Sequence, residues 1–414
     1  MGATLAEKLI ARGANKQRVK AGEIVFVAAD RLMINDYAGL IVFSVMEQHG
    51  WENRMSPDKT LFAFDHCLPP FTVKAADQLA LCRNKCRTYN ISNVAEIGRH
   101  GIAHQLMIEN FVQPGEIAVG VDSHSTTYGA LGAFACGISS SDAAGLLASG
   151  KLWLKVPETT RIRIEGKLKH CVAAKDIALK IISVVDEEET AYKCLEIVGP
   201  AVSELSMDGR FTIANMLAET GAKNILFEAD EKTCEYMGRH FDRLCSDEDA
   251  VFANELTVDL NELVPLMSFP SNAGNIHPTS NAKGRHVDQV LLGCCTNGRL
   301  EDLDQAVSLL RGKTVANGTR LIVVPASQKV YSAALAKGII ADLIDAGACV
   351  MTSSCASCFG CGPGLIGAGE CCVSTTNRNF RGRMGSSDGE IYLASAYTAA
   401  AAALTGVITD PSTI

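Results

Sequence analysis

Short apolar runs bounded by polar residues or glycine recur in the first part of the chain, and helix-like segments separate them. The runs that predict strands cover 23–29, 61–64 and 116–121. The segments that predict helices cover 4–12, 71–87 and 128–151. This alternation is typical of an α/β domain, and we expect its bounds at 1–157.

The pattern changes near Val156-Pro157, where a second series of strands and helices begins. Its expected strands are 160–165 and 194–198, and its expected helices are 173–184, 210–220 and 230–241. We expect a second α/β domain at 158–273, followed by a linker at 274–284, because the stretch 268–284 has the Ser, Pro, Asn and Gly composition of a linker.

A third α/β domain is expected at 285–414, because apolar runs and helical segments alternate again. Its expected strands are 287–292 and 320–325, and its expected helices are 300–310, 328–337 and 394–403. Three domains also agree with the length of 414 residues, which is too long for one ordinary core.

Composition restricts the possible partners. The chain is 47% hydrophobic and 20% charged with a net charge of −8, and it has no basic run, which argues against a nucleic-acid partner. We find no apolar stretch of about 20 residues for a membrane span and no apolar signal-peptide core at the N-terminus. We therefore expect a cytoplasmic chain whose 16 cysteines stay reduced, as metal ligands or buried side chains.

Polar residues follow two of the predicted strands directly. Asp65-His66 comes after the run at 61–64, and Asp122-Ser123-His124 comes after the run at 116–121. In open α/β sheets, ligands bind at the carboxyl ends of the strands. These two segments are therefore candidates for one site.

The stretch 354–384 combines thiols with guanidinium groups. Cys355, Cys358 and Cys361 are spaced three apart, and Arg378 and Arg383 follow them. Thiolates bind soft metals or iron–sulfur centres, and arginine forks bind carboxylates through two oxygens. The stretch predicts a metal site next to a site for an acidic substrate.

Plainer interpretations exist for both motifs in this stretch. A structural zinc site with four thiolate ligands could be formed by Cys295, Cys355, Cys358 and Cys361. Gly362, Gly364 and Gly367 match a dinucleotide fingerprint, but they follow a cysteine loop rather than a strand, so we interpret the match as accidental.

The order and spacing of these motifs resemble the aconitase superfamily, and more closely the large subunits of the two-chain 3-isopropylmalate dehydratases and homoaconitases. The stretches that carry the resemblance are MGATLAEKL, VDSHSTTYGALGAFACGI, SMDGRFTIANM, CCTNGRLEDL and CVSTTNRNFRGRMGS. The resemblance implies three α/β/α domains around a central cleft. It also implies a hydro-lyase for a hydroxy di- or tricarboxylate, with isopropylmalate of leucine biosynthesis as first choice and homoaconitate or 2,3-dimethylmalate chemistry as alternatives.

The resemblance also assigns residues by position. It implies a [4Fe-4S] cluster with one iron that no cysteine ligates, held by Cys295, Cys355 and Cys358. The catalytic pairs would be Asp65 with His66, Asp122 with His104, and Glu219 with His124, and His66 would be the acid that protonates the leaving hydroxyl. The substrate would be bound by Asn35, Ser123, Asn215, Asn377, Arg378 and Arg383.

A partner is also implied, because the family's swivelling domain with the catalytic serine is not expected in this chain. A small swivel-type subunit would complete the site. Two other kinds of protein stay open: a zinc-stabilised binding protein, and an RNA-binding regulator, against which the net charge of −8 argues. Some cysteines have no family counterpart to give them a role: Cys294, Cys361, Cys371 and Cys372.

Overall fold

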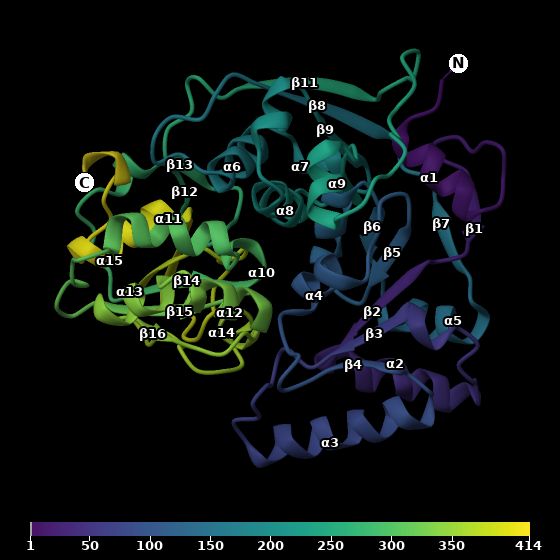
Figure 1. Ribbon diagram of the computed structural model, residues 1–414, viewed down its shortest axis with the longest axis horizontal. Helices are drawn as coiled ribbons and strands as arrows, with labels where there is room; N and C mark the ends of the chain where they lie inside the picture. Colours follow the sequence, from purple (N-terminus) through teal and green to yellow (C-terminus); the bar gives the residue numbers. More distant parts are fainter. Residues whose placement is uncertain (1) are drawn as a thin grey trace.

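The computed structural model describes residues 2–414, in which sheets carry helices on their faces (Figure 1). A parallel five-stranded sheet has the order β4-β3-β2-β5-β6. Its strands are β2 (Arg31–Asn35), β3 (Thr60–Ala63), β4 (Asn93–Ala95), β5 (Ile117–Gly120) and β6 (Phe134–Gly137). Its helices are α1 (Leu5–Gly13), α2 (Asp36–His49), α3 (Val73–Thr88), α4 (Ala103–Asn110) and α5 (Ser140–Ser149). Strands β3 and β5 are buried throughout, as expected when helices cover both faces of a parallel sheet.

The single helix predicted at 128–151 is wrong. The structure has the 3-10 helix η2 (Ser123–Leu131), then β6, then α5. Gly132 ends η2 with a φ of +79°, and β6 then pairs with β5 in the sheet. Small residues suit a helix locally, but here sheet pairing overrides that preference. Strand β1 (Ile24–Val27) pairs antiparallel with β7 (Leu152–Lys155) and forms a separate two-stranded sheet.

A second parallel sheet has the order β10-β9-β8-β11. Its strands are β8 (Thr159–Glu165), β9 (Cys194–Val198), β10 (Asn224–Phe227) and β11 (Asn254–Asp259). Its helical elements are α6 (Ala174–Val184), α7 (Glu187–Thr190), η3 (Pro200–Glu204), α8 (Met207–Met216), η4 (Leu217–Thr220) and α9 (Glu231–Met237). In Figure 1 these elements are drawn in teal.

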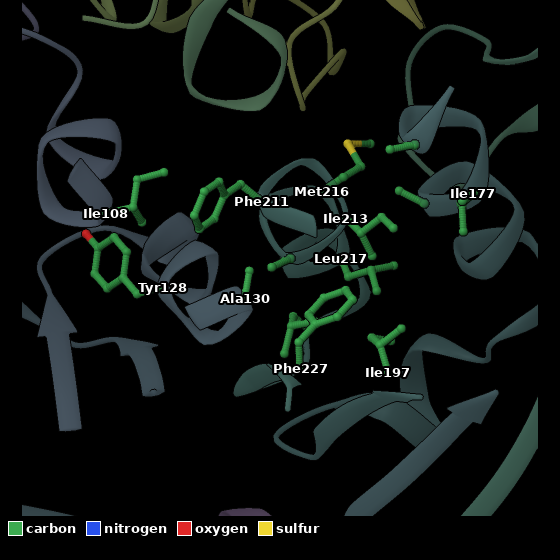
Figure 2. Packing of buried hydrophobic residues seen from close by; sticks show 14 of the residues in the cluster. Ile108, Tyr128, Ala130, Ile177, Ile197, Phe211, Ile213, Met216, Leu217 and Phe227 are labelled. Carbon is green, nitrogen blue, oxygen red and sulfur yellow. The ribbon is translucent and has the colours of Figure 1, made fainter. Parts of the chain in front are cut away.

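Helix α8 lies in the middle of the largest core cluster. Figure 2 shows Phe211, Ile213 and Met216 of α8 with Tyr128 on one side and Ile177 on the other. Tyr128 belongs to η2 and Ile177 belongs to α6, and both of these elements pack against α8. A helix buried on all sides has little freedom to move. Any polar residue that α8 presents to a site is therefore held firmly.

A third, seven-stranded sheet has the order β13-β12-β18-β17-β14-β15-β16. Its strands are β12 (Leu266–Ser268), β13 (Ile276–Pro278), β14 (Gln289–Gly293), β15 (Arg320–Val324), β16 (Cys349–Val350), β17 (Cys371–Ser374) and β18 (Glu390–Ala394). Its helices are α10 (Cys294–Asn297), α11 (Leu300–Leu310), α12 (Gln328–Ala336), α13 (Ile339–Asp345), α14 (Ala356–Phe359) and α15 (Ala396–Thr405).

The segment expected to be a linker, 274–284, contains structure. Strand β13 pairs antiparallel with β12, and β12 pairs antiparallel with β18, so this segment forms one edge of the third sheet. Its polar composition reflects an exposed edge strand rather than a free connection. The domain bounds themselves stay a prediction. Within residues 2–414, no helix has the length and apolar character needed to cross a lipid bilayer.

Candidate active site

The carboxyl ends of the first and third sheets meet around one narrow cavity. The carbonyl oxygen of Asp65, after β3, accepts hydrogen bonds from the backbone N–H of Cys355 at 2.7 Å and from Ser354 Oγ at 2.8 Å. These bonds join the histidine loop of the first sheet to the cysteine loop of the third. The cavity is lined by Asn35, Asp65, His66, Ile102, Ala103, His104, Asp122, His124, Cys295, Cys355, Cys358, Phe359, Asn377, Arg378 and Arg383.

Twelve of the fifteen residues expected from the sequence line this cavity. The other three lie directly behind it and contact its walls. Ser123 accepts a hydrogen bond from Arg378 at 2.9 Å, Asn215 donates one to Cys295 Sγ at 3.4 Å, and Glu219 binds His124 at 2.9 Å. The structure therefore brings all the candidates together, while their chemical roles stay predictions.

His66 is held by two carboxylates rather than one. Its Nδ1 lies 2.8 Å from Asp65 Oδ1 and 3.3 Å from Asp36 Oδ1. Burial by itself would lower the pKa of His66, but the charges and hydrogen bonds of both aspartates outweigh it and raise that pKa well above its usual value. The charged imidazolium form of His66 is therefore favoured.

Asp36 is a site residue that the sequence analysis missed. Its Oδ1 accepts the backbone N–H of His66 at 3.0 Å, and its Oδ2 accepts that of Cys67 at 3.1 Å. Burial opposes ionisation of Asp36, but its bond and attraction to His66 prevail, so its pKa is lowered. The sequence feature that could have indicated Asp36 is its position directly after Asn35, at the end of β2.

Asp122 joins the other two histidines. Its Oδ1 lies 3.0 Å from His104 Nε2 and 3.2 Å from His124 Nδ1, and it also accepts the backbone N–H of His124 at 2.8 Å. Burial would raise the pKa of Asp122, but the two imidazoles hold it well below its ordinary value. His124 has a raised pKa because its bonds to Asp122 and Glu219 outweigh its burial. The three expected carboxylate–histidine pairs are thus hydrogen-bonded.

Two arginines face the same cavity in different settings. Arg378 Nε donates to both Glu219 oxygens, at 2.9 and 3.0 Å, which fixes the plane of its guanidinium. The Arg383 guanidinium lies 5.0 Å from the centre of the Phe359 ring. Among residues 2–414, the buried Nε of Arg383 finds no hydrogen-bond partner. Buried donors are normally satisfied, so this one is suited to an anionic ligand.

The cysteines have the chemistry of metal ligands. Hydrogen bonds from the Cys294 and Cys355 thiols lower the pKa of Cys358 well below its usual value. Together with the charge of Arg383 they outweigh the effect of burial, which would raise that pKa. Cys295 Sγ accepts hydrogen bonds from the amides of Asn215 and Asn377, each at 3.4 Å. Such bonds favour the thiolate, but burial and the neighbouring Cys358 outweigh them and raise the pKa of Cys295 to about 11.

The spacing of the sulfurs argues against a single zinc ion. Four thiolates on one zinc lie about 3.8 Å apart, given a Zn–S distance of about 2.3 Å. In the described chain, the groups whose ligand atoms lie within 4.8 Å of one another contain histidines and aspartates but no cysteine. Cys361 does not line the cavity and lies 3.7 Å from the carbonyl oxygen of His66. Among the described residues, no three thiols are thus as close together as ligands of one zinc ion would be.

Lys175 of α6 is a second residue that the sequence analysis missed. Its buried Nζ donates to the carbonyl oxygens of Thr375 at 3.1 Å and Thr376 at 2.6 Å. Burial lowers the pKa of this lysine to about 8. These bonds fix the chain just before Asn377 and Arg378, but no motif in the sequence signalled them.

Comparisons with known proteins agree with this geometry. A sequence model of the aconitase family (aconitate hydratase) matches residues 7–283 and 275–406. The chain is 42% identical over 419 residues to the 3-isopropylmalate dehydratase large subunit of Clostridium botulinum (strain Alaska E43 / Type E3), covering 100% of both chains. It is 41% identical to a probable 3-isopropylmalate dehydratase large subunit of Methanothermobacter thermautotrophicus, again covering 100% of both chains. The crystal structure of Thermococcus kodakaraensis aconitase X (holo-form) shares the fold, with a TM-score of 0.51 and 13% identity over 85% of this chain and 84% of that one.

Proposed function

We propose that this chain, which belongs to the aconitase family, is the cluster-bearing large subunit of a 3-isopropylmalate dehydratase. Relatives that carry this name match it over their full length. The reaction is the reversible removal of water from a hydroxy dicarboxylate, a hydro-lyase reaction. We expect the enzyme to work in the cytoplasm on an acidic small molecule, without nucleic acid or membrane.

One observation carries the proposal. A single cavity holds a histidine whose pKa is raised by two carboxylates, three cysteines and two arginines. Removal of hydroxide needs an acid at the oxygen, a group that polarises the C–O bond, and cations for the carboxylates. The cavity walls supply a candidate for each.

Family membership implies an iron–sulfur cluster. We infer a [4Fe-4S] cluster held by Cys295, Cys355 and Cys358, leaving one iron without a cysteine ligand. When bound, such a group supplies a Lewis acid for the hydroxyl and an adjacent carboxylate. The position of these three thiols on the walls of one cavity supports this ligand set.

His66 is the proposed acid. Its Nδ1 is occupied by Asp65 and Asp36, so the proton that it can give away sits on Nε2. The two carboxylates keep the ring in one orientation and keep it charged. The proton on Nε2 passes to the departing hydroxyl, which then leaves as water.

The arginines are the proposed carboxylate clamp. Arg378, fixed by Glu219, presents a guanidinium of defined orientation, and Arg383 brings an unpaired buried donor. Bidentate contacts of this kind favour a planar carboxylate over other anions. Asn35 and Asn377 complete the polar wall around the reacting atoms.

The base that removes the carbon-bound proton is assigned to a separate small subunit of swivel type. The name of the relatives, large subunit, supports such a partner. We expect the chain alone to bind the cluster but to lack dehydratase activity.

The test has two stages. The chain and its Cys358→Ala variant are reconstituted anaerobically with iron and sulfide, and the metals are counted; Cys349→Ala, at an exposed thiol, is the control. About four irons and four sulfides in wild type and control, but not in Cys358→Ala, support the cluster. One zinc without sulfide would refute it. Turnover of 3-isopropylmalate only after a small subunit is added supports the assignment, whereas turnover by the chain alone contradicts it.

A further inference from the structure

Two cysteines outside the proposed ligand set lie against each other at the rim of the site. The thiols of Cys67 and Cys361 lie close enough for each to shift the pKa of the other. Cys361 Sγ also lies 3.7 Å from the carbonyl oxygen of His66. Both cysteines are partly exposed, and neither lines the cavity that holds the cluster ligands.

We propose that Cys67 and Cys361 are an oxidative modification site, at which a reversible disulfide ties the loop after β3 to the loop after α14. The pair is distinct from the cluster cysteines, and its chemistry needs neither the cluster nor the proposed activity. A failure of this proposal is therefore distinguishable from a failure of the proposed function.

The contacts of both loops favour this bond. A disulfide needs its sulfurs about 2 Å apart, so two neighbouring thiols on adjoining loops are the candidates for it. The backbone on both sides is already held. Asp36 accepts the backbone N–H of Cys67 at 3.1 Å, and the carbonyl oxygen of Ala356 accepts that of Cys361 at 3.1 Å. The bond can thus form without moving either loop far.

The oxidant is a low-molecular-weight disulfide such as oxidised glutathione. The thiolate of one cysteine attacks the oxidant, forming a mixed disulfide and releasing one small thiolate. The thiolate of the second cysteine then attacks the protein sulfur of that mixed disulfide and releases the other small thiolate. The two cysteine protons pass to these two leaving thiolates, so two cysteines are oxidised and one oxidant molecule is reduced to two thiols.

The setting also predicts how fast the reaction runs. Burial raises the pKa of Cys361 to about 11, and burial together with the Asp36 charge raises that of Cys67. Thiolate is therefore scarce at pH 7, and the exchange quickens about tenfold for each pH unit below these pKa values. The structural consequence is a covalent link one residue from His66, between segments that are 294 residues apart (361 − 67).

The experiment maps the bond directly. The full chain, with its cluster reconstituted, is incubated anaerobically with oxidised glutathione at pH 8.5, blocked with iodoacetamide and digested with trypsin without reduction. Cleavage after lysine and arginine gives peptide 60–74, whose only cysteine is Cys67, and peptide 338–378, which contains Cys361. We expect these peptides as one linked species with Cys67–Cys361 connectivity in the fragment spectrum, a loss of two free thiols, and full reversal by dithiothreitol.

Matched variants make the result specific. Cys67→Ser and Cys361→Ser should each lose the linked species, while Cys349→Ser, which removes an exposed thiol from the same peptide 338–378, should keep it. The proposal is overturned if peptide 60–74 carries only glutathione, or if it stays linked to 338–378 in the Cys361→Ser variant. A loss of thiols without any linked species would also overturn it.

Discussion

Replacing Asp36 with asparagine tests how the acid of the site is built. In an asparagine, the amide oxygen can keep the place of Oδ1, which accepts the N–H of His66 at 3.0 Å. The amide nitrogen then faces the N–H of Cys67, so the bond that Oδ2 accepts at 3.1 Å is lost. The 3.3 Å ion pair with His66 Nδ1 also loses its charge.

These losses set the expected magnitude. One charge-assisted hydrogen bond contributes about 1.5–3 kcal/mol, and removing one partner of a buried ion pair costs about 3–5 kcal/mol. Asp65 still neutralises His66 in the variant, so we expect the lower end, about 3 kcal/mol. For domains of this size, that corresponds to a fall in melting temperature of roughly 6–12 °C.

The effect depends on pH in a defined direction. Because the folded pKa of His66 is raised, its contribution to stability is fully present below its unfolded pKa of about 6.5 and is lost as pH rises through the folded pKa. Without the Asp36 charge the pKa of His66 falls. The loss of stability is therefore largest between the acidic range in which Asp36 titrates and about pH 6.5. The alkaline limb of the activity profile also moves to lower pH.

Two measurements check this reasoning. Thermal unfolding is followed between pH 5 and 9 for wild type, Asp36→Asn and a control, Asp77→Asn, which changes an exposed aspartate on α3. NMR titration of histidine-labelled protein gives the pKa of His66. If Asp36→Asn melts within about 1 °C of the control and His66 titrates as in wild type, the second carboxylate has no role in holding the proton.

Three further outcomes follow from other contacts. Arg378→Lys removes the Nε–H that donates to both oxygens of Glu219 at 2.9 and 3.0 Å, so KM for the dicarboxylate should rise about tenfold at unchanged iron content. An unchanged KM would contradict the clamp. Gly129→Ala would place a Cβ 1.8 Å from the carbonyl oxygen of Ile225, so the free energy of unfolding should fall by about 3 kcal/mol. A wild-type melting temperature in thermal unfolding would contradict the tight packing. Asp122 has a strongly lowered pKa, so it stabilises the folded state above pH 4, and this contribution disappears as pH falls further. Asp122→Asn should therefore flatten the acid limb of the plot of unfolding free energy against pH. An unchanged limb would contradict this.

Elements with strong local signals were predicted well from the sequence. The structure places helix α11 at Leu300–Leu310 and strand β9 at Cys194–Val198, the same bounds as expected. The helix has an amphipathic pattern and an acidic first turn, with Asp302 accepting the backbone N–H of Arg299 at 3.0 Å. The segment 128–151 was misjudged because β6 is short and gains its stability from pairing with β5.

The site was predictable to the extent that its residues belong to motifs. The histidine pairs and the cavity-lining cysteines came from a family resemblance, and the structure brings them to one cavity. Asp36 and Lys175 could not be found this way. Each acts on a segment that only the fold brings near: Asp36 on the loop 29–31 residues away, and Lys175 on carbonyl groups 200–201 residues away. Spacing also could not tell that Cys361 faces Cys67 instead of the cavity.

The bond between Ser354 and the carbonyl oxygen of Asp65 has a consequence for biogenesis. It joins residues 289 positions apart, so the cysteine loop receives its final shape only after most of the chain has been translated. At about 5–20 residues per second, a ribosome needs roughly 15–60 s to make that stretch. During this interval the nascent histidine loop waits without its partner. Since two of the proposed cluster ligands lie in this late loop, we expect insertion of the proposed cluster to follow translation.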